Sequence, residues 1–446
     1  MKNKFLFILL FSLVLEGMVT TQAVAGDYVH QVNTLIGTKG TGLTSGYLYP
    51  GATYPYGMVQ FTPSYFSKRS GFVINQLSGG GCEHMGNFPT FPVKGKLKMS
   101  PDNILNYRIN VSEEKGHAGY YEAMVQEDIK AKLTVTERTG MASYEYPADQ
   151  QYGTIIIGGG ISATPIEQAA IVITAPNKCE GYAEGGNFCG LRTPYKVYFV
   201  AEFDTDAFET GTWKREELMP NTTFAEGEYS GVYFTFDVNK KKNIQYKIGV
   251  SYVSVENARE NLKAENAEWD FQKIQNQAEA KWNHYLGMIE VEGTNPDRTT
   301  QFYTHLYRSF IHPNVCSDVN GEYMGADFRV HKSRSKHYTS FSNWDTYRTQ
   351  IQLLSMLDPE VASDIVISHQ LFAEQSGGSF PRWVMANIET GVMQGDPTPI
   401  LIANAYAFGA RNYDPKPIFK IMRKGAEEPG SKSQDVETRP GLKQYL

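Results

Sequence analysis

The sequence predicts an antiparallel β-sandwich followed by a set of helices. Between residues 28 and 253, short apolar runs alternate with clusters of Gly, Pro and Asn, a pattern typical of strands joined by turns. The clearest run, 129–135, alternates apolar and polar residues with a period of two. From Ser254 onward the spacing changes to that of helices. Strands followed by helices indicate a β domain that precedes an α domain.

Four further runs support the β domain, since each is short, rich in Ile, Val or Tyr, and bounded by turn residues. They cover residues 154–157, 170–173, 195–200 and 244–250. So many short strands predict a large antiparallel sandwich.

The helical part begins with residues 255–288, which contain no proline and predict one or two helices. Asn295 is placed to cap the next helix, with Pro296 at its first position. Further helices are predicted over residues 344–357, 359–375 and 397–409, and from Asp414-Pro415. Short loops between successive helices predict antiparallel hairpins, as in a bundle or a toroid.

The composition narrows the classes of function. The chain has 446 residues, 42 basic and 48 acidic, and a net charge of −6 without blocks of like charge, so we expect no nucleic-acid partner. Its 13% aromatic residues and 41 glycines fit a β-rich fold, and also carbohydrate sites, where flat rings stack on sugars.

Residues 1–25 have the pattern of a secretory signal peptide. Lys2 and Lys4 precede an apolar stretch, and the small residues that end at Ala25 form a cleavage site. The alternative, a membrane anchor, needs about 20 apolar residues, and Glu16 interrupts the stretch. We expect export, with the periplasm as destination, and no membrane contact after cleavage.

The four cysteines allow three disulfide connectivities. Cys179 and Cys189 flank a Gly-rich stretch and are placed to close it as a loop. For Cys82 and Cys316, a buried free thiol is as good an interpretation as a disulfide. The spacing fits neither a zinc ribbon nor a redox CxxC motif.

The first candidate binding loop is residues 78–89. Its glycines allow the backbone to approach a ligand closely, and Glu83 and His84 offer polar groups for sugar hydroxyls. The alternative is a long turn between strands with solvated polar residues.

The second candidate is residues 343–348. Asp345 is suited to accept hydrogen bonds from a pair of sugar hydroxyls, and Trp344 to form an apolar wall. Alternatively, Asp345 only favours the dipole of a helix in its first turn, and Trp344 belongs to the core.

Two more stretches carry acidic groups. In the stretch 377–396, Asp396 precedes a proline and is equally well explained as a helix N-cap. Residues 318–322 have the acidic spacing of a Ca²⁺ loop but lack its later ligands, so a plain turn is favoured.

The combination of motifs resembles glycoside hydrolase family 92, the calcium-dependent exo-acting α-mannosidases. The matching segments lie in the expected order at residues 32–38, 49–60, 76–82, 119–121, 133–136, 199–203, 302–307, 344–348, 377–378 and 395–396. Residues 83–88 and 397–399 depart from the commoner family pattern. The resemblance therefore does not indicate which mannose linkage the chain recognises.

The residue pattern predicts a signal peptide (1–25). With the resemblance, we expect a β-sandwich domain (26–253), a helical linker (254–292) and the start of an (α/α)₆ toroid (293–446). The resemblance implies inverting hydrolysis of terminal mannose from N-glycan-type mannosides, with mannose-containing glycans as partners and Ca²⁺ as cofactor. The substrate-binding residues it implies are Trp344, Asp345, Arg348, Asp396, Glu83 and His84.

In the family, the catalytic acid, the base and most calcium ligands lie in later helices of the toroid. The resemblance therefore implies that they lie beyond residue 446, and we leave catalytic and metal residues unassigned. The alternative is a catalytically inert carbohydrate-binding remnant of such an enzyme. A remoter one, an amidase that releases N-glycans, lacks a supporting Cys-His-Asp arrangement.

Overall fold

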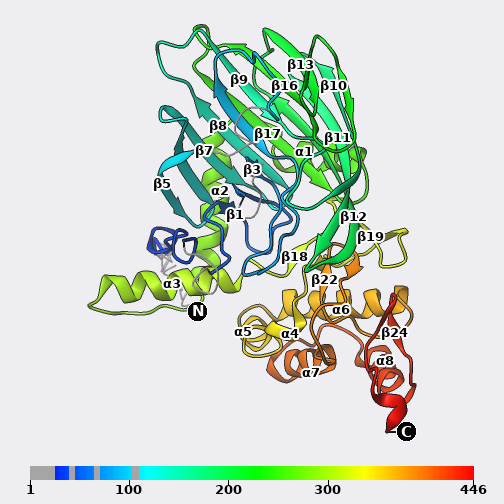
Figure 1. The fold of residues 1–446 in the computed structure, drawn as a ribbon. Coiled ribbons are helices and arrows are strands. Elements are labelled where there is room, and N and C mark those ends of the chain that lie inside the picture. The colour runs from blue at the N-terminus through cyan, green and yellow to red at the C-terminus, as the bar shows by residue number, and fades with distance from the viewer. Residues whose placement is uncertain (1–25, 40–45, 65–70, 103–109, 446) are drawn as a thin grey trace, which may run out of the picture.

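Two antiparallel sheets form the N-terminal half of the computed structural model, which describes residues 26–39, 46–64, 71–102 and 110–445 (Figure 1). The first sheet has the order β1 (Ala52–Thr53), β2 (Gln60–Pro63), β3 (Phe72–Val73), β4 (Thr90–Lys94), β9 (Tyr152–Ile157), β16 (Ser230–Asp237), β13 (Glu209–Lys214), β14 (Glu217–Pro220). The second has the order β15 (Phe224–Glu226), β10 (Ile166–Ala175), β11 (Lys178–Phe188), β12 (Leu191–Phe203), β17 (Asn243–Ser251), β8 (Thr139–Glu145), β7 (Ile129–Val135), β6 (Tyr120–Val125), β5 (Val111–His117).

The alternation predicted for residues 129–135 is that of β7. Ile129, Ala131 and Leu133 are fully buried, whereas Lys130 and Lys132 on the other face are partly exposed. The buried faces of the two sheets share one large apolar core. The predicted sandwich is therefore confirmed.

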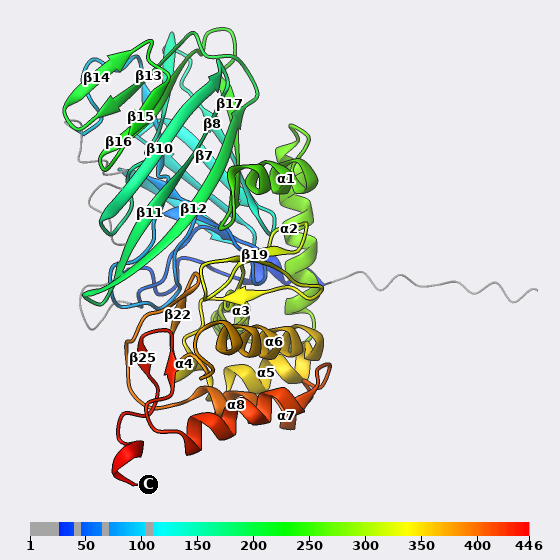
Figure 2. The ribbon, with the colours of Figure 1, turned by 90° about the vertical axis from the view of Figure 1, so that its right-hand side faces the viewer.

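Two linker helices cover the outer face of the second sheet (Figure 2). Helix α1 (Val255–Glu265) packs on β12 and β17, and α2 (Phe271–Leu286) packs on β7 and β8. Ser254 caps α1 by accepting a hydrogen bond from the N–H of Asn257, and Asp270 caps α2 by accepting one from Lys273. The second cap starts a new helix, so residues 255–288 form two helices.

The remaining helices pack around a second apolar core. They are α3 (Pro296–Ser309), α4 (Asn343–Thr346), α5 (Gln350–Leu357), α6 (Pro359–Gln375), α7 (Thr398–Phe408) and α8 (Pro415–Glu427). The predicted cap at Asn295 is confirmed, since its side chain accepts backbone N–H groups. The helix predicted from Asp414-Pro415 is α8, and Asp414 caps it by accepting the N–H of Lys416. The helix predicted over 344–357 is divided, because Thr349 has a positive φ of 67° between α4 and α5.

Four two-stranded sheets lie among these helices, and three of them are hairpins of consecutive strands. They pair β18 (Asn314–Val315) with β21 (Tyr338–Thr339), β19 (Glu322–Met324) with β20 (Val330–Lys332), β22 (Val384–Met385) with β23 (Ile388–Glu389), and β24 (Lys432–Ser433) with β25 (Val436–Glu437). No helix of the described ranges is long and apolar enough to cross a membrane. The predicted signal peptide lies outside the described residues.

The disulfide joins Cys82 to Cys189, so the predicted Cys179–Cys189 closure is wrong. The stretch between Cys179 and Cys189 is mostly strand β11 rather than a loop, with side chains that alternate between buried and partly exposed. Cys179 and Cys316 are buried free thiols. The alternative of a buried free thiol is therefore confirmed for Cys316 and wrong for Cys82.

The turn at residues 318–322 connects the two halves of the chain. The buried carboxylate of Asp318 accepts hydrogen bonds from Ser251 (2.7 Å), Asn257 (2.8 Å) and Asn261 (2.6 Å). These donors belong to β17 and α1, so the carboxylate anchors the helical half to the sandwich. The interpretation as a plain turn, with its acid satisfied by protein groups, accounts for this segment.

Candidate functional site

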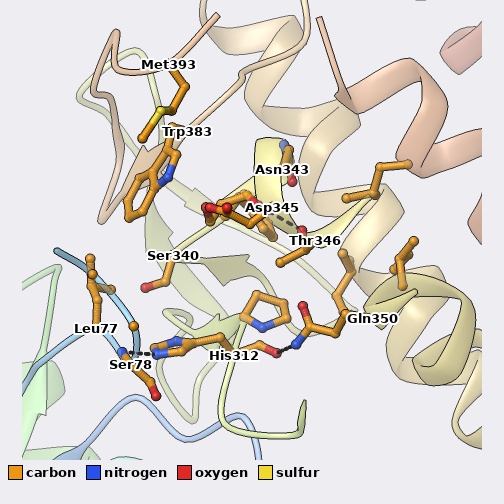
Figure 3. Close-up of a pocket in the computed structure, with 18 of the residues that line it drawn as sticks. Leu77, Ser78, His312, Ser340, Asn343, Asp345, Thr346, Gln350, Trp383 and Met393 are labelled. Atoms are coloured by element: carbon orange, nitrogen blue, oxygen red, sulfur yellow. Dashed lines mark hydrogen bonds between the residues drawn. The ribbon is translucent and has the colours of Figure 1, made fainter. Parts of the chain in front are cut away.

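A cavity of about 540 Å³ lies where loops of the sandwich meet the helical half (Figure 3). The sandwich contributes residues 77–82 and the β11–β12 turn, and the helical half contributes α4, α5 and the segments around His312, Ser340 and Trp383. Pockets between domains are common sites for small ligands.

The Gly-rich loop is held by two histidines. The backbone N–H of Leu77 donates to Nε2 of His84 (2.9 Å), and the N–H of Ser78 donates to Nε2 of His312 (2.8 Å). A Cβ placed on Gly80 would lie 2.9 Å from the His84 ring, so only glycine fits this approach. The disulfide at Cys82 ties the same loop to the β11–β12 turn. The loop therefore forms a fixed wall of the cavity.

Both rings are neutral at neutral pH. Burial lowers the pKa of His84 and of His312 from 6.5 to about 4. For His312, Nδ1–H donates to Asn314 Oδ1 (2.7 Å), which leaves Nε2 free to accept from Ser78. Both histidines therefore hold the backbone of the loop at Leu77 and Ser78 as neutral rings.

Asp345 is the one carboxylate among the described residues that line the cavity. It is exposed in the short helix α4 and accepts a hydrogen bond from the Ser342 hydroxyl. An exposed carboxylate with one short-range partner keeps free lone pairs for ligand hydroxyls. The hydroxyl and amide groups that line the cavity with it belong to Ser78, Ser340, Ser342, Asn343, Thr346 and Gln350.

The apolar wall is built by Trp383, which is 6% exposed and lies 4.5 Å from Phe188 between ring centroids. Ser340 and Met393, on either side in Figure 3, have positive φ values of 60° and 64°. Non-glycine residues in this region carry strain of about 1–3 kcal/mol each, and such strain clusters at ligand sites. An aromatic face beside hydroxyl and amide groups suits a sugar ring.

The six predicted binding residues are distributed unevenly around this cavity. Asp345 lines it, and the exposed Trp344 adjoins Asp345 in α4 without lining it. Arg348 is exposed, with its guanidinium 5.0 Å from the Tyr347 ring. His84 lies beneath the Gly-rich loop, and Glu83 is exposed beside it.

Asp396 forms an ion pair with Arg439 (2.6 Å) and does not line the cavity. It is not the N-cap either, because Pro397 holds that position of α7. Sequence reasoning did not single out Ser340, His312 or Gln350 as site residues.

The oxygen atoms of the cavity differ from the ligand set that Ca²⁺ needs. Calcium takes six to eight oxygen ligands, usually with several carboxylates. The cavity offers one carboxylate, Asp345, and otherwise neutral oxygens in the part of the chain that the structure describes. These residues do not make a calcium site by themselves.

Two family models match the chain and place it among the glycoside hydrolases. Residues 31–251 match the glycosyl hydrolase family 92 N-terminal domain, and residues 257–446 match the glycosyl hydrolase family 92 catalytic domain. The chain belongs to glycoside hydrolase family 92.

Solved structures agree with this assignment. A GH92 α-mannosidase from Bacteroides thetaiotaomicron is 25% identical, with a TM-score of 0.82, over 90% of this chain and 57% of its own. An inverting GH92 mannosidase from the same organism is 25% identical, with a TM-score of 0.81, over 94% of this chain and 58% of its own. The first has also been solved with mannoimidazole bound.

A curated relative, described as an uncharacterized secreted glycosidase of Arthroderma benhamiae, is 26% identical over 384 residues. The match covers 76% of this chain and 48% of the relative. The chain thus spans about half to three-fifths of the length of the relatives it matches.

Proposed function

We propose that the chain forms part of the substrate pocket of an exo-acting α-mannosidase, which removes terminal mannose from N-glycan-type mannosides by Ca²⁺-dependent inverting hydrolysis. The observation that carries the proposal is the cavity itself, in which Asp345 and neighbouring hydroxyls face the Trp383 wall in a member of family 92. The mannoimidazole complex of a relative supports a mannose-like ligand.

In this pocket, Asp345 accepts hydrogen bonds from two adjacent sugar hydroxyls. Hydrogen bonds to a charged group are worth about 1.5–3 kcal/mol each. Trp383 covers an apolar face of the sugar, and the loop fixed by His312 closes the opposite wall. Trp344, Arg348, Asp396, Glu83 and His84 remain proposed substrate-binding residues, the last as a support of the loop. We also propose domain boundaries at 253/254 and 292/293.

The test is to measure binding of mannoimidazole by calorimetry to the wild type and to Asp345→Ala. We expect a loss of affinity of at least tenfold with a nearly unchanged melting temperature, because Asp345 is exposed. The matched control is Asp414→Ala, which removes an exposed helix cap and should lower stability without changing affinity. Equal affinity of Asp345→Ala and wild type would contradict the proposal.

A second function, a carbohydrate-binding protein without catalysis, is favoured by one observation, the single carboxylate in the described cavity. Binding of mannoimidazole without release of mannose from a disaccharide would support it.

We further propose that the protein is exported to the periplasm. The disulfide supports an oxidising compartment, and one relative is described as secreted. Mass spectrometry of the mature protein should give Gly26 as its first residue, and an intact Met1 would contradict export by this signal.

A further inference from the structure

Two histidines and a glutamate from distant segments meet outside the cavity. His30 lies in the N-terminal 3₁₀ turn η1 (Val29–Gln31), His117 ends β5, and Glu279 lies on α2. One nitrogen or oxygen donor from each lies within 4.8 Å of the other two. In Figure 1 the N-terminal segment, in blue, runs beside α2. The cluster therefore joins three separate parts of the fold.

Neighbouring groups orient each of the three side chains. Asp27 Oδ1 is 2.6 Å from His30 Nδ1, so Nδ1–H donates to Asp27 and Nε2 keeps its lone pair. Glu279 Oε1 lies 2.9 Å from His117 Nε2 and accepts a hydrogen bond from Gln275 (2.7 Å).

The two imidazole rings also lie close together. Their centroids are 4.6 Å apart, and the Tyr120 ring stacks on His117 at 5.0 Å. Many metal sites have a donor set of this kind, with two neighbouring imidazoles and a carboxylate. In such sites a second carboxylate often accepts a hydrogen bond from the other nitrogen of an imidazole ligand.

We propose that His30, His117 and Glu279 bind a divalent transition-metal ion, with Zn²⁺ as the best fit, and that Asp27 orients His30. Zn²⁺ readily takes imidazole nitrogen together with carboxylate oxygen. Ca²⁺ prefers an all-oxygen set of six to eight ligands, so this site is distinct from the calcium chemistry of the family. The ion clamps the N-terminal segment onto β5 and α2.

The exposed fractions of the three side chains fit a site that a metal ion can enter from solvent. The His117 and Glu279 side chains are 16% and 18% exposed, whereas His30 is 55% exposed. With bonds of about 2.0–2.1 Å, two ligands of one tetrahedral zinc ion lie about 3.3 Å apart. His117 Nε2 and Glu279 Oε1 are already 2.9 Å apart, so the movement that closes the site falls to His30. His30 can make that movement, because its ring is mostly in solvent while Asn283 Oδ1 holds the backbone N–H groups of Tyr28 (2.9 Å) and Val29 (3.0 Å).

The test uses the full-length chain, stripped with a chelator and titrated with Zn²⁺ by calorimetry. We expect one equivalent to bind at micromolar free Zn²⁺, and the melting temperature to rise because the ion binds only the folded chain. His30→Ala and Glu279→Gln should each weaken this binding at least tenfold. Both changes are mild, since His30 is mostly exposed and glutamine can still hydrogen-bond to His117.

The matched control is His331→Ala, which removes another histidine–carboxylate pair, His331 with Asp327 at 2.9 Å. It should leave Zn²⁺ binding unchanged. A wild-type chain that binds no Zn²⁺ would overturn the proposal. So would equal affinities for the wild type, His30→Ala and Glu279→Gln.

Discussion

His312 accepts the backbone N–H of Ser78 across 234 positions of sequence, at 2.8 Å. Through this hydrogen bond the helical half fixes the Gly-rich loop of the sandwich, on the wall of the cavity between them. Gln350 supports the arrangement from α5, because its Nε2 donates to the carbonyl of His312 (3.0 Å). The geometry of the site therefore depends on the contact between the two halves.

The first prediction concerns this contact. His312→Ala leaves the N–H of Ser78 without its partner, and a lost buried hydrogen bond costs about 1–3 kcal/mol. We expect the free energy of unfolding to fall by that amount, measured by urea denaturation, and mannoimidazole affinity to fall as the loop loosens. His305→Ala, an exposed histidine on α3, is the control for general effects. An unchanged affinity in folded His312→Ala would show that the loop is positioned without this ring.

The second prediction concerns the thiols. Burial raises the pKa of Cys179 and of Cys316, so neither should react with a thiol reagent in the native protein. Denaturation without reductant should expose two thiols per chain, and denaturation after reduction four. Four reactive thiols without reductant would contradict the Cys82–Cys189 bond.

The Cys82–Cys189 disulfide should stabilise the fold, because it closes a loop with a sequence separation of 107. Closing a loop of this size is worth about 2–5 kcal/mol. The double variant Cys82→Ser/Cys189→Ser should therefore unfold at lower urea concentration. Cys179→Ser, which removes a free thiol, is the control for the substitution itself.

Much of the fold could be predicted from local sequence. The period of two at 129–135, the cap at Asn295 and the helix start at Asp414-Pro415 depend on neighbouring residues alone, and they gave the right elements. The break at Thr349 was missed because threonine does not favour a positive φ locally. The two helices that it separates, α4 and α5, both pack on α7, which is distant in sequence.

The site could be predicted only in part. Asp345 stands in a recognisable motif and lines the cavity. His312 acts through a contact with a segment far away in sequence, and Ser340 is identified only by its place in the cavity wall, so no local pattern marks them. The partner of Cys189 was missed for the same reason, since Cys82 reaches it only after the sheets have formed.

The third prediction is a dependence of stability on pH. Burial lowers the pKa of His84, His312 and His369 to about 4, below the ordinary 6.5. Between these values the unfolded chain binds protons that the folded chain does not, so stability is fully present above pH 6.5 and falls as the pH drops towards 4. Each such histidine adds a slope of about 1.4 kcal/mol per pH unit.

Urea denaturation between pH 7 and 5 measures this slope. His84→Gln should reduce it by the contribution of one proton. The control Leu354→Ala, which deletes a buried side chain that does not titrate, should lower stability equally at every pH. An identical slope for His84→Gln and wild type would show that His84 is not kept neutral by burial.

The last prediction is that residues 26–446, expressed alone, do not hydrolyse α-mannosides at the rate of a complete family 92 enzyme. Inverting hydrolysis needs an acid and a base about 6.5–9.5 Å apart across one sugar. Among the described residues the cavity contains one carboxylate, Asp345, which we propose binds sugar hydroxyls, so neither the acid nor the base is assigned here. Release of mannose from an α-1,2-mannobiose, with and without Ca²⁺, measures this directly.

The apolar surface of the helices leads to the same expectation. Met356 on α5, Ile400 on α7 and Phe419 on α8 are 57%, 51% and 61% exposed. Exposed apolar groups promote association, so light scattering should detect oligomers of this chain. Phe419→Lys should reduce them.

In the turnover assay, mannose binding without turnover is the expected outcome. Calcium-dependent turnover at the rate of a full-length relative would show that a second carboxylate among these residues reaches the sugar when substrate binds.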